Sequence, residues 1–403
     1  MSKQSKRGVR APVPEKSAAF FGEFWNRRLV NLAADLVVVP AVRLLRGSEG
    51  ARQTLNGLAG EQLCFHEDRL VPQLGRVGTY GFVILPGGCA WALEEHEGCT
   101  FCPFQRAVDR YVGNLPLDAA EFLRLFGASF QTIRDRVTML NVFTAGSFFN
   151  AGEIPEETQR GIAKAVAAQD NIRILRVESR LEYIEETAVA PVIAALGGKT
   201  LDVVIGFETQ DDQLRRMLRK GMSKRGLEEK ITLLKRLGAR VSIYLMIKPH
   251  HVVTEGWGIE EAEASIRFAF AAGADEIQLQ ATYIVNADPD GTKGDKNLMY
   301  EWHRDRGFEP PSLWSIAEIL RDTAPLGPVM LGAWETEIPP PMRSPSDRNC
   351  PVCRAELLAR IGRWRTTLDP AAFAPETLPS CACRTAWERE TADRSRPPDS
   401  RMA

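Results

Sequence analysis

Apolar runs of strand length alternate with amphipathic segments of helical length through the middle of the chain. Six runs between residues 79 and 281 are short and apolar enough to be buried strands: TYGFVIL, TMLNVFTA, NIRILRV, LDVVIGF, VSIYLMI and DEIQLQA. Helical spacing is found between them, in segments 116–135, 155–168, 184–196, 211–237 and 258–271. This alternation predicts an α/β fold with a parallel sheet, because parallel strands need right-handed crossover connections. Periodicity alone does not distinguish a partial barrel from a doubly wound sheet.

The segments that flank this core have different patterns. Residues 17–74 carry apolar side chains with helical spacing, from Phe20 to Val39, and predict a helical N-terminal extension. Residues 335–388 are rich in Pro and Arg, contain four cysteines and predict a small Cys-rich extension. Residues 1–16 and 389–403 are polar and predict disordered tails. The strand-rich core is therefore expected at 75–334.

Polar residues follow the predicted strands at the points where those strands end. They include Gly146 and Ser147, Glu178 and Arg180, Glu208, and Lys248 with His250. Because parallel β/α folds place their sites at the carboxyl ends of the strands, these residues are expected to share one face. Lys248 could hold a substrate anion or be structural. The acidic residues after the fourth strand could contact a ligand, or Asp211 or Asp212 could simply cap the next helix. His250 and His251 are expected to be solvated.

Three cysteines lie within fourteen residues in the loop after the first strand. Cys89, Cys99 and Cys102 have the spacing C-x9-C-x2-C. Three thiolates can bind three irons of a 4Fe–4S cluster and leave the fourth iron open to another ligand. The alternative is a zinc site that recruits a fourth residue, such as His96.

A second group of cysteines lies near the C-terminus, at Cys350, Cys353, Cys381 and Cys383. Two close pairs separated by 27 residues are typical of a tetrahedral site with four thiolates. Metal binding would also supply folding energy that such a small segment cannot obtain from its core. Zinc is the predicted metal, and a second iron–sulfur cluster is the alternative.

Composition narrows the class of protein without identifying a substrate. The net charge of −1 gives no general argument for nucleic acid, and no apolar run approaches the roughly 20 residues of a membrane span, so no membrane partner is expected. Seven of the eight cysteines fall into the two groups, which indicates a reducing compartment and a cytoplasmic location. Cys64 stands apart and is expected to be a buried small side chain. A basic run from Arg215 to Arg236 could contact RNA or be a solvated helix face.

The cysteine loop, with Phe101 before its last cysteine, resembles the radical S-adenosylmethionine (SAM) superfamily, and its long first gap resembles the Elongator-like branch. Several stretches resemble the radical-SAM subunit of archaeosine synthase: GSFFN, VESRLEYI, GFETQDDQLRRMLRKGM, YLMIKPHHVVTEGWGIEEAEASI, EPPSLWSIAEIL and DRNCPVCRAELLARI. The resemblance implies a partial (β/α)6 TIM-like barrel across the core. It also implies that Cys89, Cys99 and Cys102 bind a 4Fe–4S cluster and that SAM chelates its open iron.

The same resemblance implies further contacts to SAM. Phe101 would lie near the adenine, and Gly146 and Ser147 would replace the family's glycine-rich stretch. Glu178 and Arg180 would surround the methionine and ribose portions, and Glu208 would contact the ribose. A reduced cluster would then cleave SAM to a 5′-deoxyadenosyl radical that takes hydrogen from the substrate.

The implied substrate is a tRNA base of the 7-deazaguanine type, in which a C–N bond of a lysine adduct is cleaved. The implied partners are a reductant such as flavodoxin or ferredoxin and an enzyme that makes the substrate. Two alternatives stay open: a small-molecule nucleoside or sugar as substrate, and a non-catalytic metal-binding scaffold.

Overall fold

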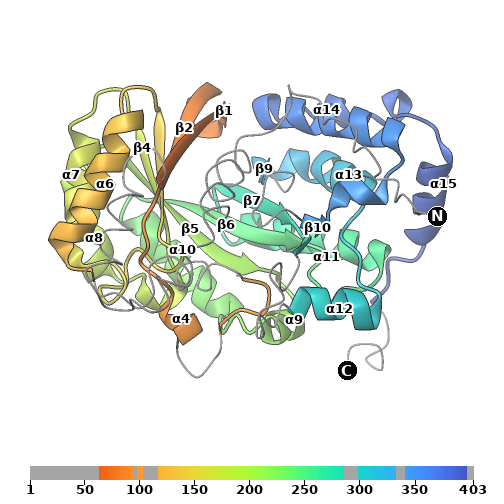
Figure 1. Cartoon of the computed structure of the whole chain (residues 1–403), viewed down its shortest axis with the longest axis horizontal. Helices are drawn as coiled ribbons and strands as arrows, with labels where there is room; N and C mark the ends of the chain where they lie inside the picture. Colours follow the sequence, from red (N-terminus) through yellow and green to blue (C-terminus); the bar gives the residue numbers. More distant parts are fainter. Residues whose placement is uncertain (1–62, 94–97, 103–116, 286–297, 333–340, 397–403) are drawn as a thin grey trace, which may run out of the picture.

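The computed structural model describes residues 63–93, 98–102, 117–285, 298–332 and 341–396 (Figure 1). The predicted tail at 1–16, most of the predicted helical extension and His96 lie outside these residues, as do residues 397–403. Among the described residues, no helix is both long enough and apolar enough to cross a lipid bilayer.

An eight-stranded sheet forms the centre of the fold, with strand order β1-β2-β3-β4-β5-β6-β7-β9. The strands are β1 (Cys64–Val71), β2 (Arg76–Ile84), β3 (Met139–Phe143), β4 (Ile174–Glu178), β5 (Thr200–Glu208), β6 (Arg240–Ile247), β7 (Glu276–Ala281) and β9 (Val329–Leu331). β1 pairs antiparallel with β2, and all later neighbours are parallel. The six predicted strands are confirmed as β2 to β7, and β9 adds a seventh parallel strand.

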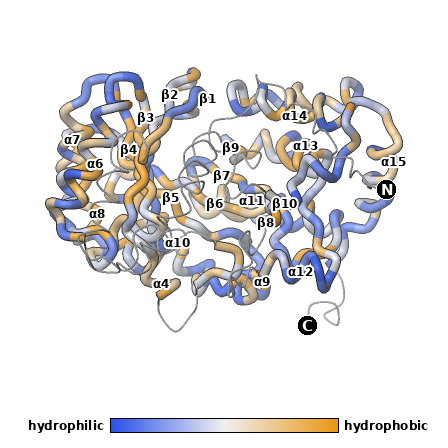
Figure 2. The backbone as a smooth tube through the Cα atoms, viewed as in Figure 1, coloured by the Kyte–Doolittle hydropathy of each residue, from blue (hydrophilic) through white to orange (hydrophobic). Residues whose placement is uncertain are grey.

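Helices cover the outer face of this sheet. They are α6 (Ala119–Ile133), α7 (Glu156–Ala167), α8 (Glu186–Ala195), α9 (Asp212–Met217), α10 (Lys224–Arg236), α11 (Glu255–Ala271) and α13 (Leu313–Thr323). The predicted segment 211–237 is divided into α9 and α10, because Arg219 and Gly221 adopt positive φ and Ser223 caps α10 by accepting from Gly226 N–H. Figure 2 shows apolar residues concentrated along the central strands, where the core between sheet and helices forms.

The sheet curls into a partial barrel. The hairpin of β1 and β2 approaches β7 across the interior: Arg69 Nη2 donates to Gln278 Oε1 at 3.5 Å, and Gln73 donates to Glu276 at 2.9 Å. The predicted partial TIM-like barrel is therefore confirmed. Its amino end is filled by a buried network in which Arg176 Nη2 lies 2.7 Å from both Asp202 Oδ2 and Glu276 Oε1.

The prediction of a helical segment up to residue 74 is wrong at its carboxyl end, where β1 lies. Cys64 pairs with Val83, and the Phe65 ring stacks on the Phe82 ring at 4.3 Å. The charged residues of CFHEDRLV obscure the strand in the sequence, whereas pairing with β2 satisfies its backbone. Cys64 is buried as expected, and its Sγ lies 2.8 Å from Thr132 Oγ1.

The Cys-rich extension packs against β1 and β9, the two edge strands of the partial barrel. Helix α14 (Pro351–Thr367) contacts β1, and Trp364 Nε1 on α14 donates to Val329 O in β9 at 2.9 Å. The two edge strands are thereby covered, which protects their unpaired backbone groups. The remaining short elements are η2 (Pro72–Leu74), α4 (Ala90–Leu93), η3 (Leu181–Tyr183), β8 (Ile284–Val285), α12 (Leu298–Arg306), η4 (Ala324–Leu326), β10 (Pro341–Arg343), η5 (Pro345–Arg348), η6 (Pro370–Phe373), η7 (Pro375–Thr377) and α15 (Ala382–Glu390).

The predicted disordered tail from residue 389 is wrong for residues 389–396. Thr391 is buried, Arg394 pairs with Glu318 on α13, and Arg396 Nη1 lies 2.8 Å from Asp211 Oδ2. These long-range ion pairs hold the segment against the barrel, and nothing in its polar composition reveals them.

Candidate functional site

The three cysteines of the first group lie in the loop that follows β2 and are all half-buried. Cys89 O accepts hydrogen bonds from Ala92 N and Leu93 N at 3.0 and 3.2 Å, which sets Cys89 at the start of α4. Cys102 N donates to Cys99 O at 3.2 Å and closes a tight turn. Burial raises the pKa of the Cys89 thiol. The three sulfurs are thus carried by one loop whose backbone is ordered at both ends.

This cysteine loop is docked on the segment between α9 and α10. Thr100 N donates to Leu218 O at 3.2 Å, and Trp91 Nε1 donates to Arg219 O at 2.9 Å. The Trp91 ring lies over Gly221, where a Cβ atom would overlap it, and 4.0 Å from the Arg180 guanidinium carbon. The loop is therefore fixed from the strand β5 side of the barrel mouth.

Glu153 fixes the loop from the opposite side. Its carboxylate accepts from Ala90 N at 2.9 Å, from Asn150 Nδ2 at 3.0 Å, and from Ser147 N. It thereby joins the backbone beside Cys89 to the turn after β3. Gly146 is required in that turn, since a Cβ there would overlap Gly88 O and the Glu153 carboxylate. Sequence reasoning missed Glu153, whose only signal is an acidic residue shortly after a strand end.

Lys220 and Glu208 form a buried ion pair beside the cysteines. Lys220 Nζ lies 2.9 Å from Glu208 Oε1 and 5.6 Å from the centre of the Phe101 ring. Burial alone would lower the pKa of Lys220, but Glu208 and the Cys99 sulfur outweigh it and raise that pKa. Glu208 has φ of 69°, an uncommon conformation for a residue other than glycine. Lys220 was noted in the sequence only as part of the basic run.

Arg180 and Glu178 complete the set of strand-end residues. Arg180 Nη2 donates to Lys220 O at 3.0 Å, and its backbone N–H donates to Ser147 Oγ at 3.3 Å. Glu178 Oε1 accepts from Tyr244 Oη at 2.9 Å, and burial raises the pKa of Glu178 to about 7. A continuous chain of contacts therefore connects Phe101, Lys220, Glu208, Arg180 and Ser147.

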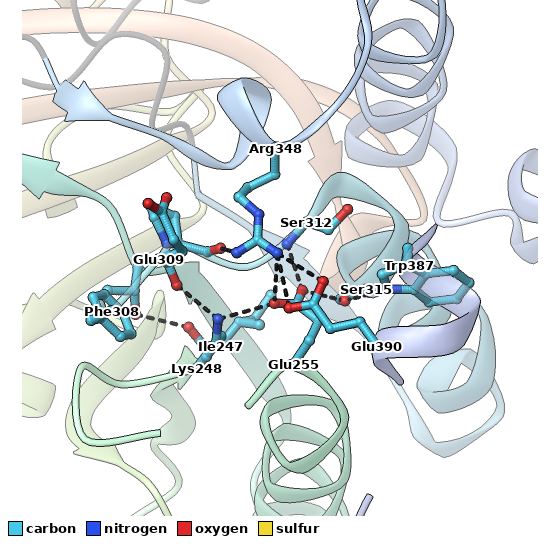
Figure 3. A network of polar contacts seen from close by, with 12 residues as sticks. Ile247, Lys248, Glu255, Phe308, Glu309, Ser312, Ser315, Arg348, Trp387 and Glu390 are labelled. Atoms are coloured by element: carbon cyan, nitrogen blue, oxygen red, sulfur yellow. Dashed lines mark hydrogen bonds and ion pairs between the residues drawn. The ribbon is translucent and has the colours of Figure 1, made fainter. Parts of the chain in front are cut away.

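The residues after β6 differ from expectation. His250 is fully buried and His251 is 8% exposed, so the prediction of solvated histidines is wrong. His250 Nε2 lies 3.3 Å from Thr100 Oγ1 of the cysteine loop, and burial lowers the pKa of His251 to about 4. Lys248 is structural: its Nζ lies 3.0 Å from Glu255 Oε2 and donates to Glu309 O at 2.8 Å (Figure 3).

Most of the basic run is engaged within the chain. Arg215 is buried and donates to Thr209 O and Met222 O at 2.7 and 2.8 Å. Arg225 and Arg236 pair with acidic residues at 2.8 and 2.7 Å, and Lys235 pairs with Asp275. Asp211 caps α9 by accepting from Gln213 N and Leu214 N. Arg215 is therefore structural, whereas Arg225 and Arg236 keep most of their side-chain surface exposed.

The second group of cysteines converges at the amino ends of α14 and α15. The four sulfurs of Cys350, Cys353, Cys381 and Cys383 all lie within 4.8 Å of one another. A single zinc ion with Zn–S bonds of about 2.3 Å places its sulfurs about 3.8 Å apart. Ligands of a cubane lie farther apart, because each binds a different iron. The four sulfurs therefore form a compact set that could hold a metal ion, whereas the described triad near the barrel mouth forms no such set.

No protein-family model matches the chain. Two curated proteins named archaeosine synthase subunit beta are similar to it. The protein from Methanosarcina acetivorans is 26% identical over 319 residues, covering 77% of this chain and 84% of its own length. The protein from Thermococcus kodakarensis is 28% identical over 255 residues, covering 61% and 72%. The predicted resemblance to the archaeosine synthase subunit is thereby confirmed.

These relatives also confirm the expectation that the chain is an enzyme. Among solved structures, methylornithine synthase is 16% identical, covers 73% of this chain and 76% of its own, and has a TM-score of 0.40.

Proposed function

We propose that this radical SAM enzyme modifies a tRNA base by the archaeosine-type reaction, in which a C–N bond of a 7-deazaguanine lysine adduct is cleaved. The observation that carries the proposal is the cysteine loop, which holds three half-exposed thiols over the strand ends. The relatives named archaeosine synthase support the substrate class. With a 4Fe–4S cluster and SAM bound by these residues, the site would supply radical chemistry able to take hydrogen from a C–H bond of the substrate.

The chain's own residues bind and orient these groups. Cys89, Cys99 and Cys102 are the proposed cluster ligands, and Glu153 and Trp91 hold their loop in place. The residues proposed to face SAM share the barrel mouth with the cysteines: Phe101, Gly146, Ser147, Glu178, Arg180 and Glu208. Lys220 pairs with Glu208 there and holds its carboxylate in place.

The four C-terminal cysteines are proposed to bind zinc. Their mutual spacing supports a single ion, and the neighbouring contacts of α14 with β1 and β9 support a structural role. The proposed partners are an external reductant of the flavodoxin or ferredoxin type and a separate subunit that supplies the modified base. The second partner is suggested by the word "subunit" in the relatives' names.

A nucleoside or sugar is the second candidate substrate. It is favoured by one observation, namely that Arg215 and Lys220 of the basic run are buried and bonded within the chain.

Two measurements test the proposal. Protein reconstituted anaerobically with iron and sulfide should form 5′-deoxyadenosine from SAM after reduction with dithionite, and Cys64→Ala should retain this activity as a matched cysteine control. The absence of 5′-deoxyadenosine under all conditions would favour the alternative that the chain is a non-catalytic metal-binding scaffold. The modified-nucleoside profile of tRNA should change when the gene is deleted, and an unchanged profile would exclude tRNA as substrate.

A further inference from the structure

Five strands of the sheet each carry, at or before the carboxyl end, an inward-facing side chain that keeps part of its surface exposed. These residues are Ile84, Phe143, Glu178, Tyr244 and Gln280 on β2, β3, β4, β6 and β7. The residues two positions earlier on the same strands point to the same face and are buried: Phe82, Asn141, Arg176, Ser242 and Gln278. The interior is therefore filled at its amino end, and a row of half-exposed side chains faces the barrel mouth, where the cysteine loop lies.

One side of this row is aromatic. The Phe143 ring stacks on Phe82 with centroids 5.4 Å apart, and Phe82 stacks on Phe65 at 4.3 Å. Phe82 and Phe65 are each 2% exposed, so Phe143 is the outermost ring of a rigid stack. Such a ring offers a stacking platform whose position is set by the two rings beneath it.

The other side of the row is polar. Tyr244 Oη donates to Glu178 Oε1 at 2.9 Å, which fixes the phenol and leaves its oxygen lone pairs as acceptors. Among the described residues, the Gln280 side chain makes no hydrogen bond, and its amide lies against Gly332, where any Cβ atom would overlap it. The backbone holds Gly332 in place, since its N–H donates to Leu279 O at 2.9 Å. The chain thus leaves room for an amide whose donors and acceptor are available.

The curl of the sheet makes these two sides face one another. The contacts of Arg69 with Gln278 and of Gln73 with Glu276 bring the β1–β2 side close to β7 at the filled end. Two positions closer to the carboxyl ends of the strands, the inward-facing side chains are the half-exposed ones and no longer belong to the buried network. A flat ligand that enters from the mouth meets an aromatic ring on one side and hydrogen-bonding groups on the other.

We infer that this inner row is the recognition site for a nitrogen heterocycle, with Phe143 as the stacking residue and Gln280 and Tyr244 as the residues that read its edge. A side-chain amide matches a ring edge that presents an adjacent N–H and C=O, which is the hydrogen-bonding face of a guanine-type base. Enzymes that act on a base extrude it into a site of this composition. The inference rests on the proposed function for the reaction that follows binding, and it names the residues that select the substrate.

The test uses the reconstituted full chain and two probes, guanosine and ribose, with binding measured by equilibrium dialysis. Guanosine should bind wild type, and ribose should not compete. Loss of the stacking ring in Phe143→Leu should weaken guanosine binding about tenfold or more, whereas Phe143→Tyr should keep it close to wild type. Gln280→Leu should also weaken binding about tenfold, because it removes a bidentate amide contact.

One control and two outcomes separate the possible failures. Iron content and the thermal unfolding midpoint should be the same in Phe143→Leu, Gln280→Leu and wild type, which shows that the variants fold. If Phe143→Leu and Gln280→Leu bind guanosine as wild type does, the inference is overturned. The other outcome is that guanosine binding follows the expected order while the reconstituted protein fails to modify tRNA from a strain lacking the gene. In that case the inference stands and the proposed tRNA reaction fails.

Discussion

The two groups of cysteines in this chain differ in how completely the protein encloses them. The C-terminal four lie within 4.8 Å of one another, and Cys350 and Cys381 are the N-cap residues of α14 and α15. Helix amino ends stabilise thiolates, so this group is a closed ligand set built on rigid elements. The three N-terminal cysteines instead lie on one loop and are held through backbone contacts of their neighbours. A closed set suits a structural ion, and an open set suits a site where another molecule must bind.

The surroundings of the two groups differ in the same sense. Beside the triad lie Lys220, Arg180, Glu208 and Glu153, which are charged, largely buried and paired with one another or with backbone. The four C-terminal cysteines lie next to helix α14, which packs against both edge strands of the sheet. We therefore expect removal of a thiol to abolish chemistry at the first group and to reduce stability at the second.

The largest effect is expected for Cys99→Ala. Because the cluster ligands act as a unit, the rate of 5′-deoxyadenosine formation should fall on the order of 10³-fold or more. Iron content should fall as well, while the metal at the four C-terminal cysteines should remain. Measurement of rate and of metal content by mass spectrometry checks this, with Cys64→Ala as control. Retention of full iron content in Cys99→Ala would contradict the assignment of this residue as a ligand.

The converse change is Cys353→Ser. Loss of a structural metal belongs to the most destabilising class of single substitutions, so the free energy of unfolding should fall by about 4 kcal/mol or more. Zinc should be lost and the iron of the triad retained in the fraction that stays folded. Thermal unfolding with and without a chelator measures the effect. A wild-type protein with eight irons and no zinc would show that both groups bind clusters.

A third change breaks the link between the two regions. Lys248 at the end of β6 and Glu255 at the start of α11 are both buried, and Arg348 of the C-terminal extension lies 4.0 Å from Glu255 (Figure 3). Arg348 also pairs with Glu390 on α15 at 3.0 Å. Burial alone would raise the pKa of Glu255, but Lys248 and Arg348 outweigh it and lower that pKa.

Lys248→Met leaves the Glu255 carboxylate buried with its main partner removed, which should cost about 3–5 kcal/mol. The double variant Lys248→Met/Glu255→Leu should recover part of this loss, since both charges are then gone. Arg348→Ala should have a smaller effect, because Arg348 is farther from Glu255. Urea unfolding of the three variants gives the order, and a double variant less stable than Lys248→Met would refute the buried-charge explanation.

The sequence predicts the central strands of this fold well, because β2 to β7 are apolar runs that are buried on both faces. It does not predict β1, whose charged residues pair along a hairpin, or β9, which is only three residues long. The cysteines of both groups are visible from spacing alone. Glu153 and Lys220 are not, since their partners are brought close only by the tertiary fold. The burial of His250 and His251 was missed for the same reason.

The smallest effect is a pH dependence at the triad's side of the molecule. Burial raises the pKa of Glu178 to about 7, from an ordinary value near 4.5, although the Tyr244 hydroxyl and Lys220 lower it. The folded state therefore holds a proton on Glu178 that the unfolded state releases, and the free energy of unfolding should decrease as pH rises from about 4.5 to about 7. Below about pH 4.5 the carboxyl is protonated in both states, so Glu178 no longer makes the free energy of unfolding depend on pH. Glu178→Gln should remove this part of the slope, and Glu157→Gln, a change at an exposed position on α7, should leave it in place. Urea unfolding at pH 5 and pH 8 measures the difference, and identical slopes for wild type and Glu178→Gln would place the titrating group elsewhere.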